Sequence, residues 1–290
     1  MDKIERVLCT LQGKPTDQVP KGEIVLSPGF IAKMAAHGSN PLEMEHEVLE
    51  RLKVDLVVVN AECSSPQEAV RYWRNESDLF IFVMLQGPLC ASIDRLEWQG
   101  LFRLVAGDLP EALTRIQDFS QRQVELAMSC LESGAHGVII ADDLAGNDRT
   151  LVSTGTLRSV FFPSLSMMQR QLHHEGVPVV FHSDGNIKSV VMDLAVMDFS
   201  AIHGLQPSAG MDLRSTRGVI GEAVTLWGNL EFEGTEELKS PERVAAEARN
   251  MIFENRDRGH YMFGSNTGLY NNVPPELAIA AYEATEMLER

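Results

Sequence analysis

The chain has 290 residues, of which 44% are hydrophobic and 23% charged, and its formal net charge is −16 at pH 7. This composition is that of a globular protein, and the negative charge argues against binding to nucleic acid backbones or anionic membranes. No apolar run approaches the roughly eighteen residues that a membrane span requires, and the first six residues lack the apolar core of a signal peptide, so a cytoplasmic location is expected.

Short apolar runs, rich in Val, Ile, Leu and Phe, recur along the chain. Near-continuous apolar runs are typical of strands that are buried on both faces. The predicted strands are residues 23–27, 55–60, 79–87, 137–143, 178–184, 200–207, 224–229 and 260–266.

Amphipathic stretches lie between these runs. Residues 42–52 and 110–132 carry apolar side chains at helical spacing, and Gly134 follows the second stretch. Ser240 is a predicted N-cap for a helix over 243–255, and a last helix is predicted to start at the Pro-Pro-Glu of 274–276.

Eight strands that alternate with helices predict an α/β fold, a single-domain (β/α)8 TIM barrel over residues 1–290. An open doubly wound sheet is the alternative, but no GxGxxG follows any strand.

The four cysteines are scattered and form no CxxC pair. This spacing suits neither a disulfide framework nor a zinc finger, so reduced thiols are predicted. Cys63 follows the second predicted strand and could reach the active-site end of the barrel, but a buried free cysteine that acts as a small apolar residue is the favoured interpretation.

Polar residues end most of the apolar runs, and the active site of such a barrel lies at the C-terminal ends of its strands. The candidate site residues are Asn60, Gln86, Asp142, Asp143, His182, Asp184, Gln206, Asn229, Glu231, Ser265 and Asn266. Because all of these ends meet at one mouth, we expect a polar pocket there.

His182 is the most informative of these residues. It ends a long apolar run, Asp184 follows two residues later, and Gly185 permits a sharp backbone turn. Imidazole can ligate a metal or exchange protons near neutral pH. A strand-end histidine that hydrogen-bonds to a nearby backbone group is the alternative.

Asp142 and Asp143 end the fourth predicted strand, after the apolar run at 138–141. Successive strand residues point in opposite directions, so one carboxylate is expected to face the mouth and the other to cap a turn. Their functional roles would be metal ligation or proton transfer, and the alternative is a helix N-cap or a loop salt bridge. His173 and His174 are expected at the surface, at the opposite end of the barrel.

Several segments, in order and spacing along nearly the whole chain, resemble the uroporphyrinogen decarboxylase superfamily. These are RVL at 6–8 with TDQVP at 16–20, QGP at 86–88, ADDL at 141–144, FHSDGN at 181–186, GNLE at 228–231, and GL at 268–269 with VPPE at 273–276. The FHSDGN segment is similar to the HSDGN of the methyltransferase-like branches.

Two departures separate the chain from the haem-pathway decarboxylase, whose substrate carries eight carboxylates. The loop at 27–30 reads SPGF and has none of the arginines found there in the decarboxylase, and Thr267 stands where the decarboxylase has a histidine. An acidic chain without these cations has no evident way to neutralise such a substrate. The resemblance therefore implies a methyltransferase-like member.

The related cobalamin-dependent methyltransferases hold zinc with His-x-Cys and a later Cys. Here the histidine remains as His182, while Asp184 and Thr267 occupy the cysteine positions. The resemblance implies a harder site, similar to that of the O-demethylase methyltransferases, with zinc held by His182, Asp184, Asp143 and Glu23, since zinc accepts carboxylates.

The activity implied is transfer of a methyl group from a small donor (a methyl ether, amine or thiol) to the cobalt of a corrinoid, or cobalamin, on a partner protein. Asp143, Asp142 and His182 would be catalytic, and Gln86, Asn60, Gln206, Asn229, Glu231 and Asn266 would bind the substrate. Two alternatives stay open: a metal-independent decarboxylase or lyase, acting on a porphyrinogen or a smaller acid, and a non-catalytic ligand-binding barrel. A homodimer would be the common habit of such barrels.

Overall fold

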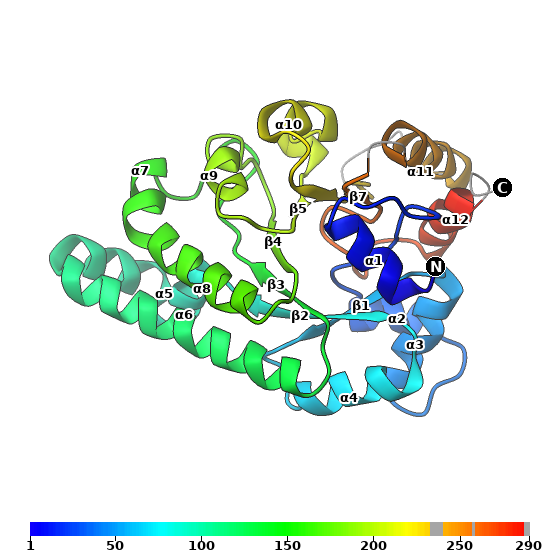
Figure 1. Ribbon diagram of the computed structural model, residues 1–290, viewed down its shortest axis with the longest axis horizontal. Helices are drawn as coiled ribbons and strands as arrows, with labels where there is room; N and C mark the ends of the chain where they lie inside the picture. The colour runs from blue at the N-terminus through cyan, green and yellow to red at the C-terminus, as the bar shows by residue number, and fades with distance from the viewer. Residues whose placement is uncertain (233–239, 257–258, 287–290) are drawn as a thin grey trace.

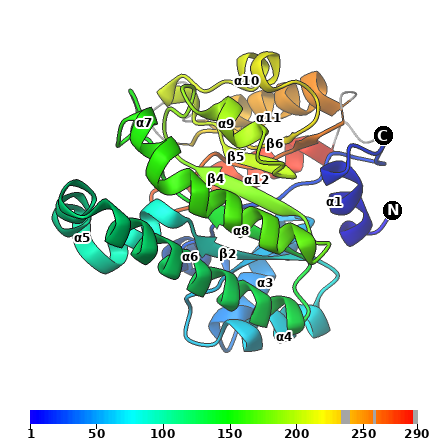
Figure 2. The same cartoon turned by 60° about the vertical axis from the view of Figure 1, so that its left-hand side comes forward.

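The computed structural model describes residues 1–232, 240–256 and 259–286. Within these ranges, a curled all-parallel sheet of seven strands runs in the order β1-β2-β3-β4-β5-β6-β7 and is surrounded by helices (Figures 1 and 2). The strands are β1 (Leu56–Asn60), β2 (Phe80–Gln86), β3 (Gly137–Ala141), β4 (Val179–Ser183), β5 (Ala201–Gly204), β6 (Thr225–Trp227) and β7 (Tyr261–Met262).

The helices follow the strands in regular alternation along most of the chain. Those in the first half are α1 (Lys3–Leu11), α2 (Pro28–Met34), α3 (Pro41–Leu52), α4 (Pro66–Glu76), α5 (Pro88–Gly107) and α6 (Leu109–Glu132). Those in the second half are α7 (Thr154–Thr156), η1 (Leu157–Phe161), α8 (Phe162–His174), α9 (Val191–Ala195), η2 (Pro207–Ala209), α10 (Leu213–Ile220), α11 (Pro241–Asn255) and α12 (Pro275–Glu286). In the described ranges, no helix has both the length and the apolar content needed to cross a bilayer.

The strands carry apolar side chains on both faces, as predicted for a sheet covered by helices. Phe80, Phe82, Ile139 and Val180 belong to the cluster that fills the inside of the curl, and their alternating neighbours pack outward against the helices. The predicted helix boundaries hold to within two residues, and the Ser240 side chain caps α11 by accepting a hydrogen bond from the Arg243 amide. All four cysteines are free thiols, in agreement with the prediction.

The segments RVL at 6–8 and TDQVP at 16–20 connect α1 to the N-terminal end of the sheet through hydrogen bonds of Arg6. The Arg6 guanidinium donates to both carboxylate oxygens of Asp17, at 2.8 and 3.1 Å, and also to Asp55. Asp55, which directly precedes β1, accepts a further bond from the Lys21 amide at 2.8 Å. Bidentate arginine–carboxylate pairs of this kind fix geometry as well as charge, so this motif acts in folding.

The prediction of a fully closed eight-stranded barrel is wrong at one position, the first expected strand. Residues 23–27 form no strand, and the segment around them joins the sheet through isolated bridges from Lys21 to Phe263 and from Leu26 to Leu269. Among the described residues, one backbone hydrogen bond joins this segment to the β1 region, from the Asp55 amide to the Lys21 carbonyl oxygen. The result is a half-barrel whose wall is unpaired between residues 22–27 and β1, a gap that we call the seam.

A buried carboxylate explains why this segment is hydrogen-bonded to the region of β7 and not along β1. Glu23 accepts hydrogen bonds from the Ser265 amide at 3.1 Å, from the Ser265 hydroxyl, and from the Tyr282 hydroxyl at 2.6 Å. These bonds anchor the segment to the loop after β7 and to α12. Complete burial raises the pKa of Glu23 to about 7, although the three hydrogen bonds oppose that rise.

Substituting Glu23 by glutamine should reduce the pH dependence of stability. Because the pKa of Glu23 is raised from 4.5 to about 7 on folding, its contribution to stability is complete below pH 4.5 and is lost as the pH rises through 7. The difference is on the order of 2–3 kcal/mol. Urea unfolding at pH 5 and pH 7.5 measures it: wild type should lose more stability than Glu23→Gln over this interval, whereas the exposed-site control Glu125→Gln should follow wild type. Equal pH dependence in Glu23→Gln and wild type would contradict the assignment.

Candidate functional site

The register of the sheet brings polar residues from separate strands to one level at its C-terminal edge. Gln86 pairs with Ala141, Ala141 with His182, and His182 with His203. Side chains of such partners point to the same face of a parallel sheet. The level below is apolar, so these residues form a polar rim over an apolar core.

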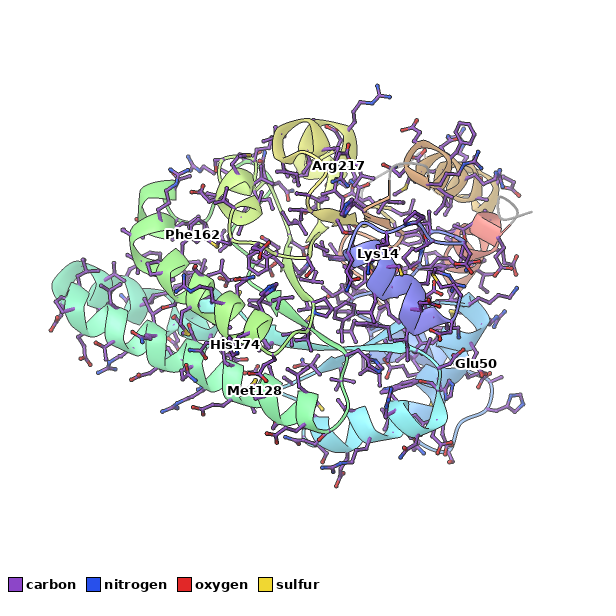
Figure 3. All side chains as sticks on the ribbon, in the orientation of Figure 1. Lys14, Glu50, Met128, Phe162, His174 and Arg217 are labelled. Atoms are coloured by element: carbon purple, nitrogen blue, oxygen red, sulfur yellow. The ribbon has the colours of Figure 1, made fainter. Side chains whose placement is uncertain are left out.

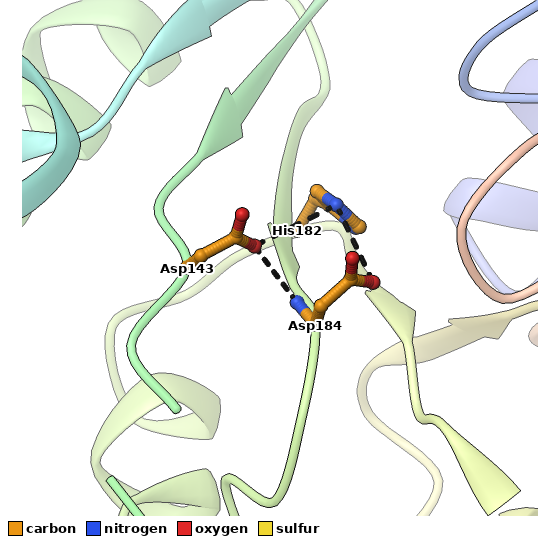
Figure 4. Close-up of side chains that lie close together, drawn as sticks. All are labelled: Asp143, His182 and Asp184. Carbon is orange, nitrogen blue, oxygen red and sulfur yellow. Dashed lines mark hydrogen bonds and ion pairs between the residues drawn. The ribbon is translucent and has the colours of Figure 1, made fainter. Parts of the chain in front are cut away.

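His182, Asp143 and Asp184 form the one group among the described residues whose side chains could together hold a metal ion. Each offers one ligand atom, and these atoms lie within 4.8 Å of one another (Figure 4). The His182 Nε2 lies 4.0 Å from an oxygen of Asp143 and 3.9 Å from an oxygen of Asp184. The same Asp143 oxygen accepts a hydrogen bond from the Asp184 amide at 2.9 Å, which fixes the two acidic residues relative to each other.

Backbone turns that only glycine tolerates set the position of this group. Gly185 has φ +78°, and a Cβ there would lie 2.5 Å from the carbonyl oxygen of Ala145. Gly204 has φ +104°, and a Cβ there would lie 2.4 Å from the carbonyl oxygen of Ser183. The sequence therefore predicts the turn after His182 correctly, and the close approach of β5 to β4 requires a second glycine.

His203 is a site residue that the sequence analysis did not identify. It is fully buried on β5, and its Nδ1 lies 2.8 Å from the Nδ1 of His182. One of these two atoms must carry the proton. When His182 is the donor, its Nε2 carries the lone pair, and this is the atom that faces Asp143 and Asp184. The available signal was a histidine placed directly before a glycine inside an apolar run.

Burial lowers the pKa of both imidazoles. For His203 the neighbouring His182 adds to the effect, and for His182 the negative charge of Asp143 opposes it. Neutral imidazole is the form that binds a metal. The pair is thus held in the state that ligation requires.

Asp142 does not face the mouth. It is completely buried, and its carboxylate accepts hydrogen bonds from the Cys90 amide at 2.8 Å and the Leu89 amide at 3.3 Å, at the first turn of α5. Burial raises its pKa to about 7. The two neighbouring aspartates thus divide as expected, with Asp142 as the helix cap and Asp143 toward the mouth, and the catalytic role assigned to Asp142 has no geometric support.

Glu23, predicted as a fourth ligand, is not part of this group. Its two oxygens are both bonded to Ser265, and one also to Tyr282. The segment that carries Glu23 leaves the strand direction at the seam, so the carboxylate turns toward α12 instead of the mouth.

The other predicted site residues line the same edge, but several are engaged in holding loops. Asn229 follows a cis peptide bond and donates to the carbonyl oxygens of Leu205 and Met211. Glu231 accepts from the Ser208 amide, the Ser208 hydroxyl and, at 3.4 Å, the Asn266 amide group.

The remaining predicted residues differ in what they offer a ligand. The Gln206 side-chain oxygen accepts from the Gly185 amide at 3.2 Å, which ties it to the turn after His182. Gln86 has a buried side-chain oxygen without a hydrogen-bond partner among the described residues, and Asn60 is exposed at the end of β1. His174 lies at the far end of α8 beside Met128, as expected for a surface residue remote from the mouth (Figure 3).

Comparisons with known proteins agree with this architecture. A family model described as uroporphyrinogen decarboxylase (URO-D) matches residues 39–287. A methyltransferase from Methanosarcina mazei has a similar structure, with a TM-score of 0.81, 18% identity and full coverage of both chains. A B12-independent methionine synthase from Shewanella sp. W3-18-1, solved with selenomethionine, has a TM-score of 0.59 at 13% identity, covering 96% of this chain and 97% of that one. A search of curated proteins gives no match.

The different roles of the two neighbouring aspartates can be measured by unfolding. Asp142→Ala should lower the free energy of unfolding by about 1–2 kcal/mol, because it leaves the first amides of α5 without an acceptor. Asp143→Ala, at an exposed position, should change it by less than about 0.5 kcal/mol. Urea denaturation of both variants tests this, and a larger loss in Asp143→Ala would overturn the assignment of roles.

Proposed function

The chain belongs to the uroporphyrinogen decarboxylase family, and from this premise we propose that it is a zinc-dependent methyltransferase. The observation that carries the proposal is the convergence of one imidazole and two carboxylates at the C-terminal edge of the sheet. The fold similarity to a methyltransferase from Methanosarcina mazei supports it.

The side chains fit zinc. Catalytic zinc sites use three protein ligands from nitrogen, oxygen or sulfur donors and leave one position open. The Nε2 of His182 and one oxygen each from Asp143 and Asp184 make such a set. Zinc would act there as a Lewis acid on the heteroatom that carries the methyl group.

The surrounding residues have distinct tasks in this reaction. His203 holds the His182 ring through the hydrogen bond between their Nδ1 atoms, and the Asp184 amide holds the Asp143 carboxylate. About half of the Asp143 side chain is exposed, so solvent would reach the site beside this carboxylate. Gln86, whose buried side-chain oxygen has no hydrogen-bond partner among the described residues, would orient the donor molecule.

The proposed acceptor is the cobalt of a corrinoid on a partner protein. The bond between the heteroatom and the methyl carbon would break with its electron pair left on the heteroatom, which would take a proton from solvent. A Co(I) corrinoid would supply the electron pair of the new bond to the methyl carbon and would become Co(III). The decarboxylase alternative needs cations for an acidic substrate. Neither Asp142 nor Asp143 forms an ion pair with any arginine or lysine in the described part of the chain, which favours the methyltransferase.

Removing the imidazole of His182 should abolish metal binding. Protein purified without chelators or an affinity metal, and then offered zinc, should contain about one zinc per chain by elemental analysis, and His182→Ala should contain none. The matched control is His174→Ala, which removes an exposed imidazole at the other end of the barrel and should keep the zinc.

The same samples test whether the protein transfers a methyl group. Zinc-loaded wild type, mixed with reduced cobalamin and a panel of methyl ethers, amines and thiols, should form methylcobalamin with at least one donor, and His182→Ala should form none. If wild type binds no zinc, or if His182→Ala retains both zinc and turnover, the proposal is wrong and a metal-independent lyase or a binding protein takes its place.

His203 should act as a positioning residue for the metal ligand. His203→Phe removes the hydrogen bond to His182 and should weaken zinc binding by about 10- to 100-fold, the usual effect of losing such a partner. His203→Gln keeps a side-chain oxygen that can accept the bond and should recover most of the affinity. Competition with a chelating dye gives both values, and equal affinities in all three proteins would exclude the role.

A further inference from the structure

A cavity opens into the wall of the half-barrel at the seam. Its volume is about 280 Å³, near the lower limit for small-molecule sites. Its walls combine Val58 and Met84, which pack toward the inside of the curl, with Val59 on the outer face of β1 and Trp73 of α4. The cavity is therefore lined by residues of both faces of the sheet at the seam, where the backbone is unpaired.

Glu45 lines this cavity from α3, at a position where the helix pattern calls for an apolar residue. Leu42 precedes it by one turn on the core-packed face, and the buried Val48, Leu49 and Leu52 follow on that same face. Residues three and four apart share one side of a helix. A carboxylate therefore interrupts an otherwise apolar stripe, and such breaks in pattern are characteristic of functional positions.

The Glu45 carboxylate makes no hydrogen bond or ion pair with any residue in the described ranges, although the Glu45 side chain is only partly exposed. Burial alone raises its pKa to about 7. The other three glutamates of this helix do have partners. The Glu43 carboxylate accepts a hydrogen bond from the Ser39 amide, the Glu47 carboxylate accepts one from the Ala36 amide, and a Glu50 oxygen lies 3.7 Å from the His46 Nε2.

We propose that this cavity binds a small organic cation, a tertiary or quaternary ammonium, with its charge against Glu45 and its alkyl groups against the apolar walls. A partly desolvated carboxylate without a partner is less stable than one in water, and a cation that reaches it offsets that loss. Most of the lining side chains are apolar, and the polar ones are Glu45, Asn60, Cys63 and Trp73. A primary ammonium carries three donors and no alkyl groups around its charge, so it matches such a lining poorly. A tertiary ammonium has one hydrogen-bond donor and a quaternary ammonium has none, and the alkyl groups of either can pack against the apolar side chains of Leu42, Val58 and Met84.

The proposed site does not depend on the metal. It lies at β1 and β2, whereas His182, Asp143 and Asp184 lie on or after β3 and β4. A protein that lacks zinc should therefore bind the cation as well as a loaded one does. This separates a failure of the cavity proposal from a failure of the methyltransferase proposal.

Cys63 provides a local reporter. The sequence interpretation as a buried thiol is wrong, because Cys63 is exposed, and it borders the cavity. Cys130 is buried, and Cys9 and Cys90 are only partly exposed. The rate at which a small alkylating reagent modifies Cys63, located by peptide mass spectrometry, therefore reports whether the cavity is filled.

The probe is choline, and 3,3-dimethylbutan-1-ol is its uncharged isostere. At fixed ionic strength, millimolar choline should slow the alkylation of Cys63 several-fold in wild type and bind with a measurable heat by calorimetry, and the alcohol should bind at least tenfold more weakly. Glu45→Gln should abolish the protection. Glu50→Gln, on the exposed side of the same helix (Figure 3), should retain it.

A second variant guards against misfolding as the explanation. Glu45→Leu restores the apolar stripe, so it should unfold at a higher urea concentration than wild type and still fail to bind choline. Equal protection by choline and the alcohol, undiminished protection in Glu45→Gln, or no protection in wild type would each overturn the proposal.

Discussion

The parallel register across β3, β4 and β5 is the constraint on which the site depends. It places Ala141, His182 and His203 at one level, with their side chains on one face. A slip of one residue would turn every side chain of a strand to the other face of the sheet. His203 would then leave the interior, and His182 would lose the partner that fixes its ring. The apolar residues below, such as Val180 and Ala201, hold the register because the same slip would expose them.

The seam shows how one buried carboxylate can change the closure of a barrel. An eighth strand would need regular pairing on both sides, but the hydrogen bonds of Glu23 hold its segment against β7 and α12. A desolvated carboxyl group that lacked those bonds would be strongly destabilising, so the position of the segment is set by the donors of Ser265 and Tyr282 rather than by strand pairing with β1. Leu42 and Glu45 of α3 line the cavity beside the resulting free edge of β1 together with Val58 and Val59, and a helix placed beside an edge strand is one of the ordinary ways to protect it. Glu45 belongs to this helix.

The sequence predicts local features better than long-range pairing. Seven of the expected strands are present because long runs of Val, Ile and Phe can only be buried, although β7 is reduced from 260–266 to Tyr261–Met262. The run at 23–27 has the composition of a strand, but its fate depends on Ser265 and Tyr282, more than 240 residues away. His182 and Asp143 were recognisable because each closes an apolar run. His203 was not, because β5 ends at Gly204 rather than at the predicted Pro207, and its partner lies on another strand.

The charge of the proposed zinc ligands is the same as that of the thiolate set in the related methyltransferases. One neutral imidazole and two carboxylates carry −2, as do one imidazole and two thiolates, so either set neutralises a dication. The softness differs, because carboxylate oxygen donates less charge to the metal than thiolate sulfur does. A metal held by Asp143, Asp184 and His182 would stay more electrophilic and would favour a hard leaving atom, oxygen or nitrogen, over sulfur. Within the proposed function, the replacement of cysteine by Asp184 therefore favours methyl ethers or amines over methylthiols as donors.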